Sequence, residues 1–429
     1  MPQRLPSCRV VLRSAGIVQG MGAGHSHGGH DLEHVEVGAR ARTILVVFLA
    51  VVGVLSVAGM IWLWPGSGEM ESQVKRQVGS ANYSFEQATI TQLEYSCENV
   101  GPTEPTCHTA TVELTSGPEK GQQVQIILQG PAAQAGLRPG DGISVGRVDL
   151  KENGVNYNYE TASRHPVLIV MGVLFVLVVA AVARWKGLFA LLGLGIAGAV
   201  LTGFMLPALL VGKPGIIVAI VGGTAIMFVV LYVAHGVSIR TSTALAGTLI
   251  GVAITAGLGA VSTWAARLSG FADDHDFTLA SVAPNLNFRE LLMVAIIIGG
   301  LGVLNDVTIT QSSAVWELRA AAPSMSRMKL FAAGMRIGRD HIASTIYTIV
   351  FAYAGSALVI LLTLYYTERP ALALLNAEMF SGEIIRTLGS AIGLILSVPI
   401  TTGIAALTVA GPKPEDDAAS FRPRHAETA

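Results

Sequence analysis

An acidic residue in the middle of an apolar run is the side chain of this sequence best suited to chemistry. The run extends from Leu291 to about Ser313, and Asp306 follows a cluster of glycines within it. Its length, about 20 residues, is enough to cross a bilayer. A charged side chain at the bilayer centre costs about 3 kcal/mol or more, and such residues commonly bind ions, relay protons or pair with an opposite charge. Asp306 is therefore the first candidate for binding a cation or a proton.

Further polar side chains recur beside Asp306 and in the two apolar segments that follow it. Arg336, Asp340 and Ser344 are spaced one helical turn apart and are expected on one helix face. Glu383 and Arg386 are also about one turn apart, at the start of the last apolar segment. The candidates for a polar path are Asp306, Thr308, Thr310, Gln311, Arg336, Arg339, Asp340, His341, Glu383 and Arg386.

Two interpretations of these side chains are open. In the first, Asp306 binds a cation or a proton, and the arginines bind an anion or modulate the pKa of Asp306. In the second, Asp306 pairs with Arg336 or Arg339, and the residues form a fixed ion-pair lock between helices. A third reading applies to the arginines alone, which could serve only to determine topology.

The sequence gives no support for an enzyme. It lacks a His-Glu-x-x-His metal motif and a phosphate-binding loop that ends in Lys-Ser or Lys-Thr. Asp340 and His341 are adjacent in sequence, so on a helix they point to different faces and do not form a catalytic pair. We therefore predict no catalytic residues and no cofactor.

The apolar residues occur in blocks, which is typical of a polytopic membrane protein. Of the 429 residues, 51% are hydrophobic, 13% are charged and 48 are glycine, whereas soluble domains carry about 25% charged residues. About eight runs are long enough to span a bilayer, namely 43–64, 166–183, 188–210, 214–234, 242–263, 290–311, 342–366 and 384–409. The expected surroundings are a lipid bilayer, and a net charge of −1 argues against a nucleic-acid partner.

The distribution of Lys and Arg predicts the orientation of these spans. The amino-terminal arm carries several arginines, among them Arg40 and Arg42, which places it in the cytoplasm. With about eight crossings, Arg240 and the basic residues from Arg319 to Arg339 fall on the same side, and the opposite loops hold few such residues. Both termini are therefore predicted to be cytoplasmic.

Residues 1–42 and 411–429 are predicted to be disordered cytoplasmic segments. The first is rich in Gly and His, and His25, His27 and His30 are weak candidates for metal ligands. The alternative is a flexible tail with incidental histidines. Translation could start at Met1 or at Met21.

Residues 65–164 lie between the first span (43–64) and a seven-helix membrane domain (165–410), and they are predicted to form a small β-rich exoplasmic domain. Short alternating runs at 110–114, 123–128 and 142–148 are separated by Gly and Pro turns, as in a barrel or a sandwich. Cys97 and Cys107 both fall here. In an oxidising compartment a disulfide between them is predicted, and two free buried thiols are the alternative.

Several longer motifs make the chain similar to the YibE/F family of bacterial membrane proteins. Two of them are Leu-Gly-Val-Leu-Asn-Asp-Val-Thr-Ile-Thr-Gln at 301–311 and Arg-Ile-Gly-Arg-Asp-His-Ile-Ala-Ser-Thr at 336–345. Shorter ones are Met-Gly-x-Gly-His-Ser-His at 21–27, Tyr-Val-Ala-His-Gly at 232–236, Arg-Thr-Ser-Thr-Ala-Leu-Ala-Gly-Thr at 240–248, Ala-Tyr-Ala-Gly at 352–355 and Gly-Ser-Ala-Ile-Gly-Leu at 389–394.

The resemblance implies a multi-spanning protein of the bacterial plasma membrane with a soluble domain after its first helix. It supports the candidates between Asp306 and His341 as motif positions and assigns no role to any of them. Asn305 stands where related sequences often have a second Asp, which weakens a metal site built from two carboxylates. Tyr347 stands where Asn is expected.

The sequence therefore favours a permease-like protein that moves a small ion or solute through a path lined by the last three spans. The alternative is a membrane scaffold or assembly factor that does not transport and acts through a protein partner of the exoplasmic domain.

Overall fold

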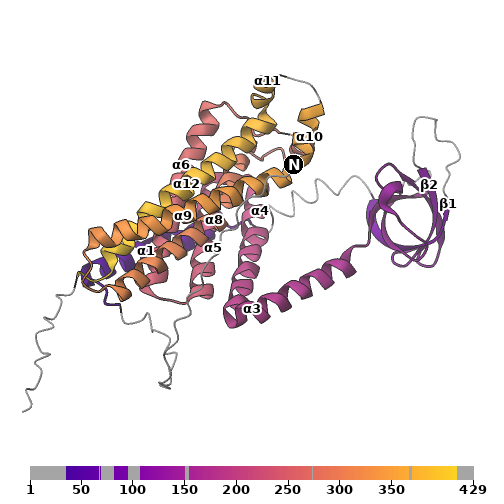
Figure 1. Ribbon diagram of the computed structural model, residues 1–429. Helices are drawn as coiled ribbons and strands as arrows, with labels where there is room; N and C mark the ends of the chain where they lie inside the picture. Colours follow the sequence, from indigo (N-terminus) through magenta and orange to yellow (C-terminus); the bar gives the residue numbers. More distant parts are fainter. Residues whose placement is uncertain are drawn as a thin grey trace, which may run out of the picture.

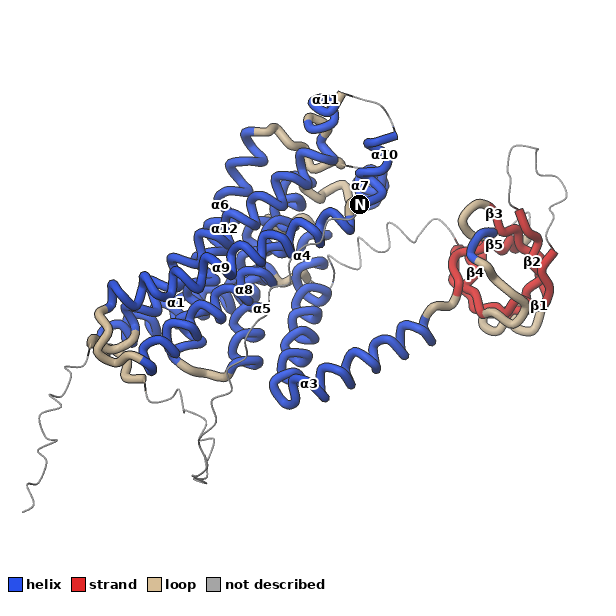
Figure 2. The backbone as a smooth tube through the Cα atoms, in the orientation of Figure 1, coloured by secondary structure: helices blue, strands red, loops and turns tan. Residues whose placement is uncertain are grey.

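The chain consists of a bundle of long helices and a small β-barrel, as Figures 1 and 2 show for the computed structural model. The structure describes residues 35–66, 68, 82–94, 107–149, 154–272, 274–366 and 370–412. The barrel lies beside the bundle and is joined to it through the helix α3.

Helices make up the larger part of the described chain. Their bounds are α1 Ala39–Leu63, α3 His165–Val200, the π-helical turn η3 Leu201–Met205, α4 Leu206–Leu210, α5 Gly215–His235, α6 Ile239–Ala265, α7 Asp274–Val282, α8 Phe288–Ala321, α9 Arg327–Ser356, α10 Leu358–Tyr366, α11 Ala371–Leu375 and α12 Glu378–Thr408.

Six helical stretches of the described chain are long and apolar enough to cross a membrane: 39–63, 165–210, 215–235, 239–265, 288–321 and 378–408. The count of eight spans is not confirmed. The second and third predicted spans form one continuous stretch that bends at Arg184, whose φ of 52° and ψ of −139° are not helical. The seventh predicted span is divided between α9 and α10, and α9 is too polar to qualify.

Packed helices of the bundle run both antiparallel and parallel: Gly215 and Gly223 of α5 face Val294 and Leu301 of α8, so that α5 and α8 run parallel. Gly53 and Gly59 of α1 face Phe228 and Val221 of α5, so that these two helices run antiparallel. At one end of the bundle the residues just before α1 and just after α12 meet, because Val37 pairs with Val409 as an isolated β-bridge. The start of α1 and the end of α12 therefore lie on the same side.

The centre of the bundle is the close packing of α6, α8 and α12. A Cβ atom at Gly247 of α6 would overlap the Thr401 hydroxyl of α12, and a Cβ at Gly393 of α12 would overlap the Thr255 hydroxyl of α6. At Gly251 an added Cβ would lie 2.8 Å from Leu304 of α8. Glycines thus allow three backbones to approach closely, as is common between membrane helices.

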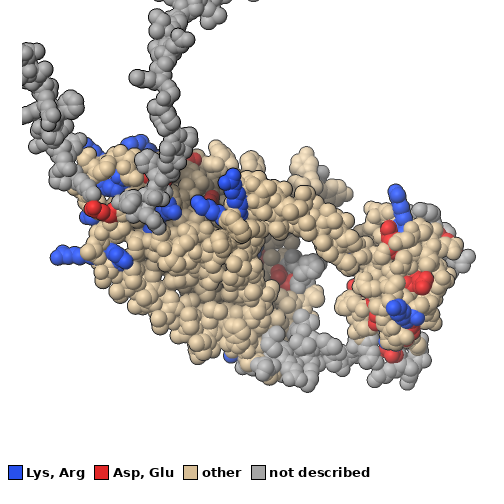
Figure 3. All heavy atoms as spheres, turned by 90° about the horizontal axis from the view of Figure 1, so that it is seen from below, with Lys and Arg blue, Asp and Glu red and all other residues tan. Residues whose placement is uncertain are grey.

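Lys and Arg side chains gather at one end of the bundle, which we call the basic end (Figure 3). This end holds the starts of α1, α6 and α9 and the end of α8, and its cations are Arg40, Arg42, Arg240, Arg319, Arg327, Lys329, Arg336 and Arg339. The opposite end holds the starts of α8 and α12.

The barrel is a five-stranded antiparallel sheet with the order β3-β2-β1-β4-β5. Its strands are β1 Asn82–Glu94, β2 Cys107–Leu114, β3 Gln123–Gln129, β4 Gly142–Asp149 and β5 Val155–Ala162. The two edge strands β3 and β5 also contact each other, which closes the sheet in the arrangement of an OB-type barrel. The core consists of alternate apolar side chains, such as Ile90, Val112 and Ile126.

The three strand segments predicted from alternation lie within β2, β3 and β4, so that these parts of the β-rich domain are confirmed. The prediction missed β1 and β5, which carry mixed polar residues on both faces. Cys107 is disulfide-bonded. Cys97 lies outside the described residues, and its pairing with Cys107 stays a prediction.

We expect Gly247→Ala to destabilise the bundle, because the new methyl group would overlap Thr401. Overpacking of this kind costs about 1–3 kcal/mol. Thermal unfolding of the purified protein in detergent should show a lower midpoint. Gly257→Ala on the same helix is the control, because no atom lies within 4 Å of its added Cβ. Equal midpoints for the two variants would show that the close approach at Gly247 is not required.

Candidate functional site

The helices predicted to line a polar path enclose a cavity at the opposite end of the bundle. Its volume is about 490 Å³, and it lies between α8, α9 and α12 with the loop before α7. Apolar residues of α8 form one wall, among them Leu291 and Ala295, and charged residues of α12 form another. The cavity therefore offers a small solute both charge and an apolar surface.

Three ionisable side chains of α12 face this cavity. Arg386 Nη1 lies 3.1 Å from Glu383 Oε2, and both side chains are about one-third exposed. Glu378 accepts hydrogen bonds from the Ser269 hydroxyl at 2.8 Å and from the Gly270 backbone amide at 2.5 Å, which ties the loop after α6 to α12. Arg386 Nε is buried and has no hydrogen-bond partner among the residues that the structure describes. This N–H group can thus donate one further hydrogen bond.

Tyr353 of α9 also lines the cavity. Its hydroxyl oxygen lies 3.0 Å from the position that a Cβ atom would take at Gly299 of α8. Tyr353 was not among the sequence candidates. It occurs in the short Ala-Tyr-Ala-Gly motif, which could have drawn attention to it. Its hydroxyl makes no hydrogen bond within the described part of the chain, so it is available to a solute.

Toward the basic end, α9 closes on α8 and α12. Gln311 of α8 is 1% exposed, and its Nε2 donates a hydrogen bond of 2.7 Å to the Gly334 carbonyl of α9. A Cβ at Gly338 would lie 2.6 Å from Val398 of α12 and 3.0 Å from the Gln311 amide. The cavity is therefore open at the opposite end and sealed by dry packing in the basic half.

Asp306 does not lie in the cavity. Its side chain is 70% exposed on the outer surface of α8, and its carboxylate lies 3.8 Å from His341 Nε2 of α9. This Nε2 is buried without a hydrogen-bond partner. Among the residues that the structure describes, neither Arg336 nor Arg339 pairs with Asp306, so the pairing of the second interpretation, between Asp306 and one of these arginines, is not seen within the chain.

The physical reason is the helical position of Asp306. Thr308 and Gln311, two and five residues later, point into the bundle, where Thr308 lies 2.6 Å from the Thr248 hydroxyl of α6. At 100° per residue, Asp306 then points away from α6 and α12. Thr308 and Gln311 are therefore packing residues, and Thr310, beside them, is half-buried.

The remaining candidates on α9 are exposed. Arg336, Arg339 and Asp340 all lie on its outer surface, whereas His341 is half-buried against α8. The sequence also gave no hint that Arg319 is 5% exposed. Its Nη1 donates hydrogen bonds to the Pro323 and Met325 carbonyls, at 3.0 and 2.7 Å, and so holds the turn between α8 and α9.

The predicted metal ligands His25, His27 and His30 lie outside the described residues, and their role stays a prediction. Within the described ranges, no group of three or more His, Cys, Asp or Glu side chains is arranged to hold a metal ion.

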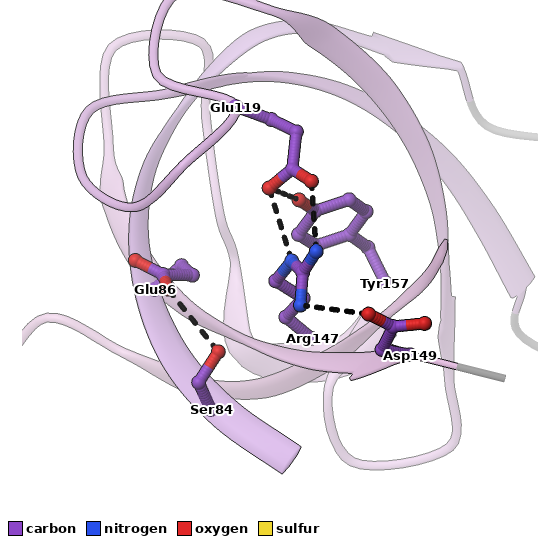
Figure 4. Close-up of polar contacts among 6 residues, drawn as sticks. All are labelled: Ser84, Glu86, Glu119, Arg147, Asp149 and Tyr157. Atoms are coloured by element: carbon purple, nitrogen blue, oxygen red, sulfur yellow. Dashed lines mark hydrogen bonds and ion pairs between the residues drawn. The ribbon is translucent and has the colours of Figure 1, made fainter. Parts of the chain in front are cut away.

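The barrel contains a second polar cluster, shown in Figure 4, which consists of Glu119, Arg147, Asp149 and Tyr157. Arg147 donates two hydrogen bonds to Glu119, at 3.0 and 2.8 Å, and the Tyr157 hydroxyl donates a third at 2.9 Å. These hydrogen bonds lower the pKa of the Glu119 carboxyl, and Glu119 raises the pKa of Arg147. Because these groups satisfy one another, we interpret the cluster as a structural clasp rather than a binding site.

Apolar helices around a closely packed centre, with a polar cavity among the last of them, define a multi-helix membrane protein with a small β-barrel. The model of the YibE/F-like protein family matches residues 171–411, which is more than half of the chain. The chain therefore belongs to the YibE/F-like family. The match includes the cavity and Asp306 but not α1 or the barrel.

Neither the curated proteins nor the solved structures include a match to this chain.

The Glu119 clasp should make the stability of the barrel depend on pH. The folded-state pKa of Glu119 lies below its ordinary value of 4.5. The stabilisation is therefore present above about pH 4.5 and is lost as the pH falls toward the folded-state pKa. Glu119→Gln should abolish this pH-dependent part of the stability of the barrel.

The measurement is hydrogen–deuterium exchange of β4 and β5 in the full-length protein between pH 7 and pH 4, corrected for the intrinsic exchange rate. The control is Glu113→Gln, an exposed glutamate on β2. If Glu119→Gln keeps the full loss of protection on acidification, other carboxylates are responsible for it.

Proposed function

We propose that this protein is a permease-like transporter of a small ion or charged solute, and that the solute enters through the cavity between α8, α9 and α12. The observation that carries the proposal is this cavity of about 490 Å³, which is open at one end of the bundle and closed by packing toward the other. A site that is open to one side and sealed from the other is what alternating access requires.

The proposed binding groups are Glu383, Arg386 and Tyr353. The Glu383–Arg386 pair presents both charges at the wall of the cavity, and Arg386 Nε lacks a hydrogen-bond partner within the described chain. The seal is the contact of Gln311 with Gly334 and Gly338, which a transport cycle must loosen. Since α9 is held there by one side-chain hydrogen bond and by small residues, a modest tilt of α9 would open the path.

The proposed topology has eight crossings, with the two arms of α3 counted separately and α9 together with α10 as the seventh. The basic end then faces the cytoplasm of a bacterium, and the cavity opens on the exoplasmic side. The clustering of Lys and Arg at the end where α1 begins and α12 ends supports this orientation.

Transport through the cavity can be tested by reconstitution of the purified protein in liposomes. Fluxes of protons, alkali-metal cations and small anions would be compared for the wild type, Glu383→Gln and Arg386→Gln. Loss of one partner leaves a partly buried charge unpaired, so we expect the flux to fall at least about tenfold. The exchanged pair Glu383→Arg with Arg386→Glu should recover part of it if only the pairing matters.

The control is Glu113→Gln, an exposed glutamate of β2 outside the cavity. A wild-type flux that is unchanged in both cavity variants would place the path elsewhere. If the folded wild type carries no flux for any probe, the transporter proposal fails for these ions.

The rival proposal is a scaffold or assembly factor that acts through the barrel. The first arm of α3, residues 165–183, favours this proposal. It separates the barrel from the bundle. Its apolar side chains, such as Val167, Leu168 and Ile169, are more than 60% exposed. This surface could receive a protein partner of the barrel.

The two proposals differ in a strain that depends on this gene. The scaffold requires the barrel, so deletion of 70–160 should abolish growth while Glu383→Gln and Asp306→Asn are tolerated. The transporter predicts loss of function for Glu383→Gln at normal protein abundance. Membrane abundance and thermal stability of each variant, with Asp306→Ala beside Asp306→Asn, separate loss of function from misfolding.

A further inference from the structure

The outer surface of α8 carries a stripe of small and polar residues where lipid-facing residues would be apolar. The stripe follows one helix face at intervals of three and four residues. Its members are Gly299, Gly302, Asp306, Thr310, Ser313 and Glu317, all exposed or half-buried. No atom lies within 4 Å of a Cβ added at Gly302. Within the described chain, this face is therefore largely uncovered.

Asp306 lies near the middle of the helix that carries it. With a rise of about 1.5 Å per residue, it is about 27 Å from the start of α8 at Phe288 and about 22 Å from its end at Ala321. Thr308, two residues after Asp306, contacts Thr248 in the middle part of α6. A carboxylate with 70% of its side chain exposed at this depth would face hydrocarbon, which is costly.

The neighbouring surface of α9 is polar to the same depth. Arg336, Arg339, Asp340, Ser344 and Tyr347 are all exposed, and Tyr347 is 65% exposed. His341 is level with Asp306, so Ser344 and Tyr347 lie one to two turns further toward the opposite end. Beyond them the exposed residues of α9 become apolar, with Val350 and Phe351. The outer face of α8 and α9 thus resembles a protein interface in its basic half.

The charges on this face are complementary to those on the same face of a second copy. Asp306, Glu317 and Asp340 supply three carboxylates, and Arg336 and Arg339 supply two guanidinium groups. Within the described chain, none of these five groups pairs with another of them, and Asp306 lies 3.8 Å from His341 Nε2. A surface that carries charges of both signs in nearly equal number fits a two-fold interface, where each copy provides both halves of every pair.

We infer that the outer face of α8 and α9 binds a second copy of this chain in the membrane, and that Asp306 of each copy pairs with Arg336 of the other. Arg336 is about five residues, or about 8 Å, closer to the basic end than the level of Asp306. An extended arginine side chain covers most of this distance. Gly302 lets the two α8 helices approach closely on the side of the pairs away from the basic end.

This interface also explains why the pair expected from the sequence is missing within one chain. The residues are of the right kind, but their side chains point outward from α8 and α9. In the dimer they become buried and paired, so the cost of a carboxylate within a membrane span is offset in both copies.

The first test is thiol crosslinking of the full-length protein in native membranes. Ser344→Cys, Tyr347→Cys and Gly302→Cys, each in a Cys8→Ser background, should give covalent dimers at least about tenfold more efficiently than a control outside the interface. The control is Val54→Cys on α1, which is 68% exposed. It is also matched in depth. Leu301 of α8 contacts Gly223 of α5, so Asp306 and Phe228, each five residues further along its helix, lie at about the same level. Gly53, next to Val54, faces Phe228.

The second test separates a pair between copies from a lock within one copy. Asp306→Arg and Arg336→Asp would be expressed together with different affinity tags. Each variant alone brings like charges together, whereas a mixed dimer restores both pairs across the interface. We therefore expect mixed dimers to exceed each homodimer at least about tenfold in co-purification, since like charges across an interface cost several kcal/mol.

The inference is overturned if the native protein has the mass of one chain by native mass spectrometry and none of the three cysteines crosslinks above the control. It is also overturned if mixed and single expression give equal dimer yields, since Asp306 would then not pair between copies. Rapid labelling of an Asp306→Cys thiol by a water-soluble maleimide would show that this face borders water. A complex mass that includes a different protein would assign the face to that partner instead.

Discussion

The close approach of α6, α8 and α12 is the constraint on which the rest of the bundle depends. Hydrophobic burial does little to bring helices together in lipid, so contact relies on dispersion and on short distances between backbones. Gly247 and Gly393 each pack directly against a threonine hydroxyl group of the facing helix, and these contacts fix both the separation and the register of the helices. The directions in which Thr308, Gln311 and Asp306 point follow from that register.

The sequence predicted the membrane class, the family and the existence of a β-rich domain, because long apolar runs and alternating strands depend on local composition. It did not predict which side of α8 Asp306 occupies, since helical periodicity gives relative but not absolute orientation. Once Thr308 is known to touch Thr248, the outward position of Asp306 follows. The Glu383–Arg386 pair was predictable because its partners are one helical turn apart on one helix.

The strands β1 and β5 show a second limit of the sequence. Both carry polar residues on alternate and on adjacent positions, and their burial is decided by the closure of the sheet between β3 and β5. Glu86 of β1 is 7% exposed, yet its carboxylate accepts a hydrogen bond of 2.7 Å from the Ser116 hydroxyl. A buried glutamate satisfied by a loop serine contradicts simple hydrophobic patterning, and the contact joins residues that are far apart in sequence.

The polarity of α9 has a consequence for how the protein is made. This helix does not qualify as a membrane span by its own composition, whereas α8 before it and α12 after it do. Its place in the bundle therefore depends on the side chains that receive Gly334 and Gly338, namely Gln311 of α8 and Val398 and Thr402 of α12. Because Val398 and Thr402 come after α9 in the chain, the contacts that hold α9 are complete only once the last helix has been synthesised.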